Sequence, residues 1–146
     1  MTIEKFGAAK AQDIGLLERE YGLTLPKDYT SFLLAYNGGV IAKVEHSGVF
    51  ISDINAYVHI DVLFGVGTGC KNSEIDHWTN EYKDEMPEKA LIIGDCIEHG
   101  FIVLICNEID FGICYWDHSY VFPNSNDETN TYYITDTFTG FIESLL

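Results

Sequence analysis

The segment that most constrains the fold is Leu25–Gly39, because it marks both ends of a helix. Pro26 suits the first helical position, where the missing N–H of proline would have had no partner. Residues on one apolar face follow at helical spacing: Tyr29, Phe32, Leu33 and Tyr36. Asn37, Gly38 and Gly39 tolerate the left-handed turn that closes a helix. The pattern therefore predicts a helix over Pro26–Tyr36.

The order of the other periodic segments predicts the fold class. Apolar residues at helical spacing indicate further helices over Lys10–Tyr21, Ser73–Lys83 and Phe138–Leu146. Ser73 and Asp136 are the expected N-terminal caps of the last two. Alternating or β-branched runs indicate strands: Gly48–Ile51, Ala56–Phe64, Ala90–Ile93, Phe101–Cys106, Ile113–Trp116 and Tyr132–Ile134. Hairpin-length joints favour antiparallel pairing. We expect an α+β fold: a single, mainly antiparallel twisted sheet with helices packed mostly on one face, an N-terminal helical hairpin and a C-terminal helix.

The composition indicates one domain over residues 1–146. Hydrophobic residues make up 47% of the chain, enough for a single core. No apolar run approaches the roughly 20 residues that span a bilayer, and Met1–Lys10 lacks the apolar stretch of a signal peptide. A cytoplasmic protein is expected.

The 4 cysteines form no C-x-x-C pair, so reduced thiols are expected rather than a zinc site.

Charge is distributed unevenly along the chain. The formal net charge is -15, which disfavours direct binding to nucleic acid or to an anionic membrane. No lysine or arginine follows Lys89, whereas acidic residues continue to the C-terminus: Asp95, Glu98, Glu108, Asp110, Asp117, Asp127, Glu128, Asp136 and Glu143. Such a surface either keeps a protein soluble or attracts a basic protein partner, and charge alone leaves both interpretations open.

Several motifs together resemble the SUKH superfamily, which includes a yeast cell-wall synthesis regulator and many bacterial immunity proteins. They follow one another in the order of that family: Glu18, Gly22, Leu25-Pro26-Lys27-Asp28-Tyr29, Asn37-Gly38-Gly39, Pro87, Leu91–Asp95, Tyr115–His118 and the final helix. The loop Asp95–Gly100 is less glycine-rich than the usual version, so no ligand contact is transferred to it. The resemblance implies the same α+β fold and a protein that neutralises a cognate toxin.

The strand Tyr115-Trp116-Asp117-His118 supplies candidate contact residues. Alternate residues of a strand point to opposite faces, so Tyr115 and Asp117 face solvent if Trp116 faces the core. An exposed tyrosine among carboxylates suits a cationic partner, and a purely structural role for Tyr115 fits equally well. The predicted partner-binding residues are Glu98, Glu108, Asp110, Tyr115 and Asp117.

Catalytic and ligand-binding patterns are weak in this chain. The glycine cluster Gly65–Gly69 fails as a phosphate loop, because Cys70 separates it from Lys71. His59 and Asp61 share one strand face and form the best candidate for a metal site or general base, but they match no metal motif. Aliphatic neighbours make the cysteines inert. No catalytic residue, cofactor or metal is predicted, and the chain is not expected to be an enzyme.

Three functions stay open at this point. The first is an immunity protein that occludes the nucleic-acid site of a basic toxin domain with its own acidic charge. The second is a regulatory or scaffold module that binds a cellular protein. The third is a small-ligand domain or enzyme that would use His59, Asp61 and the glycine cluster. The resemblance favours the first, and the sequence carries no signal for the oligomeric state.

Overall fold

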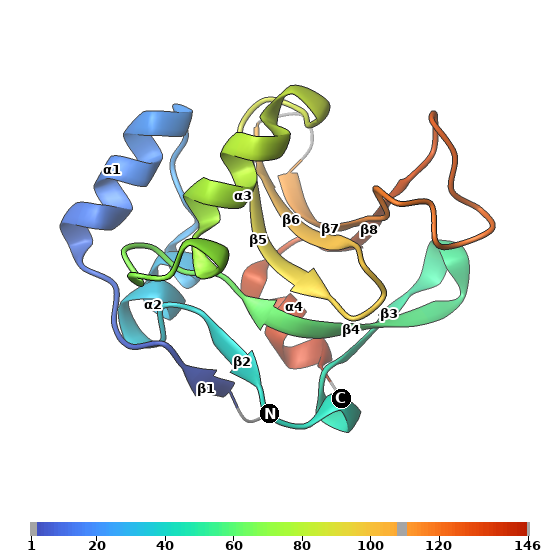
Figure 1. Ribbon diagram of the computed structural model, residues 1–146, viewed down its shortest axis with the longest axis horizontal. Helices are drawn as coiled ribbons and strands as arrows, with labels where there is room; N and C mark the ends of the chain where they lie inside the picture. The colour runs from blue at the N-terminus through green and yellow to red at the C-terminus, as the bar shows by residue number, and fades with distance from the viewer. Residues whose placement is uncertain (1–2, 108–110, 146) are drawn as a thin grey trace.

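The computed structural model describes residues 3–107 and 111–145, in which an antiparallel sheet is surrounded by α-helices (Figure 1). The described strands are β1 (Ile3–Lys5), β2 (Gly39–Ile41), β3 (Gly48–Ile51), β4 (Ala56–Leu63), β5 (Ala90–Cys96), β6 (Phe101–Cys106), β7 (Phe111–Trp116) and β8 (Thr131–Thr135). The described α-helices are α1 (Ala11–Tyr21), α2 (Lys27–Ala35), α3 (Ile75–Tyr82) and α4 (Phe138–Ser144). The predicted α+β class is confirmed.

The sheet follows the order β1-β2-β4-β5-β6-β7-β8, with β3 paired to β4 outside this path. Each pairing between these strands is antiparallel, and β5 to β8 follow one another as neighbours, as the hairpin-length joints predicted. Strands β1 and β2 were not predicted, because a three-residue strand is too short to show a period of two.

Helix α2 is held by the side chains of its own motif. Asp28 accepts hydrogen bonds from the backbone nitrogen and the hydroxyl of Thr139, at 2.8 and 3.0 Å, and so fixes the first turn of α4. The rings of Tyr29 and Phe138 pack with their centroids 4.8 Å apart. Tyr36 was predicted to lie on the apolar face of this helix, but its side chain is 41% exposed. Helix α2 ends one residue before it.

The turn after α2 has the predicted left-handed backbone, with φ of 52° at Asn37 and 81° at Gly38. A Cβ atom on Gly38 would lie 2.3 Å from the carbonyl oxygen of Leu63, so this approach of two backbones requires glycine. The buried amide of Asn37 donates to the carbonyl of Val66 and accepts from its N–H, both at 2.8 Å. The motif therefore joins the end of α2 to the segment after β4.

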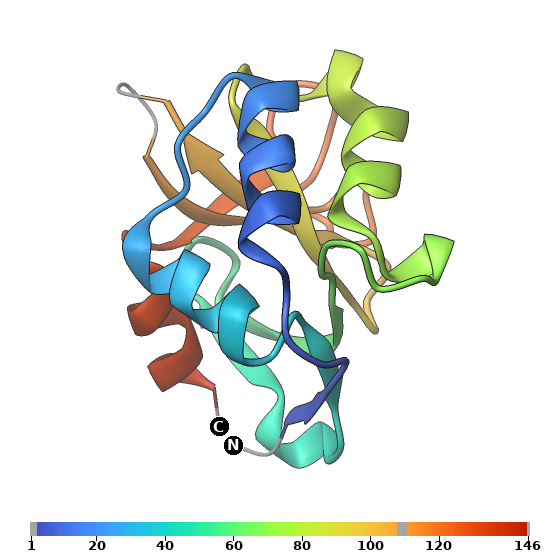
Figure 2. The ribbon, with the colours of Figure 1, turned by 90° about the vertical axis from the view of Figure 1, so that its left-hand side faces the viewer.

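Helices lie on both faces of the sheet, not mostly on one. Helix α3 packs on β5, and the rings of Trp78 and Tyr82 contact Phe101 of β6. Helix α4 contacts β7, β8 and β3 on the opposite side, together with α2 (Figures 1 and 2). Both faces need cover because successive residues of Phe101–Ile105 are all buried, as is usual for a central strand.

Two of the predicted caps differ from the structure. Glu74, not Ser73, is the N-cap of α3. Thr137, not Asp136, caps α4, and its hydroxyl accepts from the backbone nitrogen of Gly140 at 3.0 Å. Each cap lies one residue later than predicted; Thr137 is a residue type suited to capping, whereas Glu74 makes no side-chain cap hydrogen bond. No helix in the described part of the chain has the length and apolar character needed to cross a membrane.

Candidate functional site

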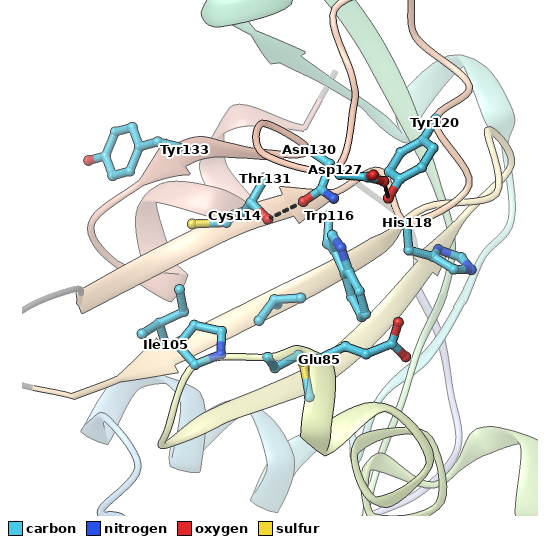
Figure 3. Close-up of a pocket in the computed structure, with 13 residues that line it drawn as sticks. Glu85, Ile105, Cys114, Trp116, His118, Tyr120, Asp127, Asn130, Thr131 and Tyr133 are labelled. Atoms are coloured by element: carbon cyan, nitrogen blue, oxygen red, sulfur yellow. Dashed lines mark hydrogen bonds between the residues drawn. The ribbon is translucent and has the colours of Figure 1, made fainter.

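A groove of about 700 Å³ lies on the face of β6, β7 and β8 beyond the end of α3 (Figure 3). Alternate residues of the strands form its floor: Val103, Ile105, Cys114, Trp116, Thr131 and Tyr133. The register explains this set, because Val103 lies opposite Cys114, which lies opposite Tyr133. We call this feature the β6–β8 groove.

Two loops form the walls of the β6–β8 groove. The segment after α3 contributes Glu85, Met86 and Pro87, and the loop between β7 and β8 contributes His118, Tyr120, Asp127 and Asn130. In Figure 3 the ring of Trp116 extends from β7 toward Glu85, with Tyr120 and Asp127 on its other side. The Tyr82 ring meets Trp116 edge-on at a centroid distance of 5.6 Å, so the indole has a fixed orientation.

Asp117 holds the β7–β8 loop in place. Its buried carboxylate accepts hydrogen bonds from the backbone nitrogens of Val121 and Phe122, at 3.0 and 2.9 Å, and from the hydroxyl of Ser125 at 2.6 Å. These bonds fold the loop back beside the end of β7. The prediction that Asp117 faces solvent is wrong, because the backbone of its own loop covers it.

Tyr115 is also fully buried, so the prediction that it faces solvent is wrong as well. Its ring packs over Gly100, where a Cβ atom would lie 2.2 Å from the Tyr115 hydroxyl oxygen. Burial raises the pKa of the Tyr115 phenol far above its usual range. The physical reason is that the face of β7 that carries Tyr115 is itself covered, so the burial of Trp116 on the other face does not expose Tyr115.

The remaining predicted contact residues lie away from the β6–β8 groove or outside the described residues. Glu98 accepts from the backbone nitrogen of His59 at 2.7 Å, and its other carboxylate oxygen lies 2.7 Å from His59 Nδ1. This pair fastens the β5–β6 turn to β4. Glu108 and Asp110 lie outside the described residues.

The charges around the β6–β8 groove have one sign. Its lining includes the carboxylates of Glu85 and Asp127, and no lysine or arginine of the described part of the chain belongs to it. The Asp127 carboxylate accepts from the Tyr120 hydroxyl at 2.7 Å. The exposed fractions of Tyr120 and Tyr133 are 45% and 49%, so the groove presents aromatic surface beside carboxylates.

A second, smaller cavity of about 360 Å³ adjoins the first at His118. Asp95 lines it, and burial together with the nearby charge of Asp61 raises the pKa of Asp95 to about 6. Burial lowers the pKa of His118, whose Nδ1 atom is buried and has no hydrogen-bond partner within the described residues. The two groups respond to burial in opposite directions, as expected for an acid and a base.

Comparison with known protein families identifies the family to which the chain belongs. The model of the SMI1 / KNR4 family (SUKH-1) matches residues 8–144. The chain belongs to the SUKH-1 family. The match runs from before α1 to the end of α4, so it includes every strand and loop of the β6–β8 groove. Comparison with curated proteins found no matching relative.

In this SUKH-1 chain, the backbone of the glycine cluster Gly65–Gly69 binds a side chain of the protein itself. The backbone nitrogens of Gly67 and Thr68 donate to the carboxylate of Glu74 at 2.9 and 2.7 Å. A carboxylate of the protein thus occupies the place that a phosphate would take in a glycine-rich loop. Among the residues that the structure describes, no group of three or more histidine, cysteine, aspartate or glutamate side chains is arranged to hold a metal ion.

The described thiols of the core are not activated nucleophiles. Burial raises the pKa of Cys96 well above that of a free thiol and raises the pKa of Cys106 to about 11. Both therefore stay protonated near neutral pH and pack as small apolar side chains.

Sequence reasoning missed the residues that form the groove walls. Glu85, Asp127 and Tyr120 come from loops, where no periodic pattern indicates direction. Alternation in the predicted strands could have placed Val103, Ile105, Cys114 and Trp116 in two same-face pairs. Bringing these pairs together requires the strand register, which only the structure supplies.

Proposed function

We propose that this SUKH-1 protein is a cytoplasmic immunity protein that binds and neutralises a basic toxin domain without catalysis. The observation that carries the proposal is the β6–β8 groove, which combines exposed tyrosines with carboxylates and, among the described residues, has no lysine or arginine in its lining. Aromatic side chains beside charges are typical of the centres of protein interfaces. The family match supports a protein-binding role of this kind.

Charge supports a basic partner. The net charge is -15, and the part of the sequence that forms β5 to β8 contains acidic residues but no lysine or arginine. Toxin domains that act on nucleic acid carry positive charge where phosphates bind. An acidic inhibitor would be attracted over about one Debye length, roughly 8 Å at physiological salt, and would compete with phosphate for the same surface.

The test begins by reading the genes next to this one and takes every basic C-terminal toxin domain that they are found to encode. Each domain is expressed in cells with and without the chain, and survival is measured alongside binding of the purified pair by calorimetry. We expect survival only with the chain, and a 1:1 complex that weakens as salt rises. A complex with a housekeeping protein, and no binding to any adjacent toxin domain, would instead favour a regulatory module.

Stoichiometry separates inhibition from catalysis. A binding protein protects only up to one toxin per chain, because each bound toxin removes one inhibitor. Titration of toxin activity against the purified chain should therefore reach zero at an equimolar ratio. Loss of toxin activity at a small fraction of that ratio would show turnover and would refute the non-catalytic proposal.

A further inference from the structure

The floor of the β6–β8 groove suits an aliphatic side chain. Val103, Ile105 and Cys114 form adjacent parts of it, and the indole of Trp116 borders them. The exposed fractions of Val103 and Ile105 are only 3% and 6%, so a strand or loop of a partner that crosses the floor would bury mainly its own apolar side chains and the exposed rings of Tyr120 and Tyr133.

The charged groups stand on two sides of Trp116. Glu85 approaches from the segment after α3, and Asp127 from the β7–β8 loop (Figure 3). Within the described residues neither carboxylate takes part in an ion pair, and both residues are exposed. A cation beside Trp116 would therefore lie in the electrostatic field of two carboxylates that have no ion-pair partner among the described residues.

The aromatic groups favour arginine over lysine. Tyr120 and Tyr133 are about half exposed, and both rings border the groove. A guanidinium is planar and weakly hydrated, so it stacks on an aromatic ring while its edges donate to carboxylates. An ammonium is a compact, strongly hydrated charge and cannot make both contacts with comparable geometry.

We infer that the β6–β8 groove is the docking site for an arginine-bearing segment of the partner, with aliphatic neighbours on the apolar floor and a guanidinium between Glu85 and Asp127. The inference rests on the proposed function for the basic character of the partner. A second copy of the chain is a poor occupant, because two surfaces of net charge -15 repel each other.

The test uses six-residue peptides that alternate leucine with arginine, with lysine, or with citrulline, the uncharged isostere of arginine. Binding is followed by NMR through the two indole N–H signals. Trp116 lines the groove and Trp78 does not. The charge variant is Glu85→Gln with Asp127→Asn, and the matched control is Glu4→Gln with Glu45→Gln, which removes as much charge from exposed positions outside the groove.

We expect the arginine peptide to shift the Trp116 signal saturably, and the lysine peptide to bind several-fold more weakly. The Glu85→Gln/Asp127→Asn variant should bind the arginine peptide about tenfold more weakly, roughly threefold for each exposed ion pair lost, and the control variant less than about twofold. Equal binding of the citrulline peptide, or equal losses in both variants, would overturn the inference.

The two proposals fail separately. If an adjacent toxin binds the chain but neither the toxin nor the arginine peptide shifts Trp116, the immunity function stands and the docking site is wrong. If the arginine peptide binds at Trp116 and no toxin is neutralised, the docking site stands and the immunity function is wrong.

Discussion

Replacement of Asp117 by alanine tests how the groove wall is built. The carboxylate accepts three hydrogen bonds within its own loop, from Val121, Phe122 and Ser125. A hydrogen bond to a charged group contributes about 1.5–3 kcal/mol, and water can re-satisfy part of what is lost in a partly buried loop. We therefore expect Asp117→Ala to lower the free energy of unfolding by about 3 kcal/mol.

Urea unfolding followed by tryptophan fluorescence measures this change. Asp117→Asn keeps one oxygen that can accept a hydrogen bond but replaces the other acceptor oxygen by an NH₂ group, which is a donor. Its loss of unfolding free energy should therefore be intermediate, about 1–2 kcal/mol. The control is Asp127→Ala in the same loop, because that exposed carboxylate accepts a single described hydrogen bond, from Tyr120. Its free energy of unfolding should stay close to that of the wild type.

Hydrogen exchange locates the effect. The amides of Val121 and Phe122 donate to Asp117, so their protection should fall in Asp117→Ala before that of the sheet amides. A loss of less than about 1 kcal/mol, with both amides still protected, would refute the role given to Asp117.

The other predictions concern packing and pH. Gly100→Ala should destabilise the fold by about 2 kcal/mol or more, because the added methyl overlaps the Tyr115 ring, whereas Gly15→Ala in the open α1 helix should stabilise it slightly; thermal melts compare the two. Because the pKa of Asp95 is raised to about 6, the folded state binds this proton more tightly than the unfolded chain, so stability falls as pH rises from about 4 to about 6. Asp95→Asn should remove that slope and gain about 1 kcal/mol at pH 7, after allowance for solvent screening. Because the pKa of His118 is lowered in the folded state, the unfolded chain binds this proton more tightly, and stability falls as pH drops below about 6.5. His118→Phe should remove this loss of stability, which melting temperatures measured from pH 4 to 8 would show.

The sequence predicted the four helices and six of the eight described strands, but not which faces of the sheet are covered. The helix α2 and its left-handed exit at Asn37 were predicted because a proline, a periodic apolar face and a glycine pair are local signals. The burial of Tyr115 was not, because the alternation rule assumes that one face of the strand is solvated. The unbroken apolar run Phe101–Ile105 was the available sign that both faces are covered.

The structure does not place the predicted contact residues in the β6–β8 groove. An acidic contact surface was expected, and Asp117 was assigned to it as a contact residue. The structure shows Asp117 shaping the loop instead, and it places Asp127 of that loop on the groove wall. The geometry of the turns decides which acid of this loop is buried and which is exposed. Turn geometry leaves no periodic pattern in the sequence, so the difference between Asp117 and Asp127 could not be predicted.

Association kinetics between this chain and any toxin domain that it neutralises in the survival assay test the central claim most directly. Stopped-flow mixing is performed from about 0.05 to 0.5 M salt with the wild type and with Glu85→Gln/Asp127→Asn. Electrostatic steering predicts an association rate that falls steeply with salt, a lower rate for the variant at low salt, and convergence of the two at high salt. An association rate independent of salt and identical in the two proteins would contradict binding through the acidic groove.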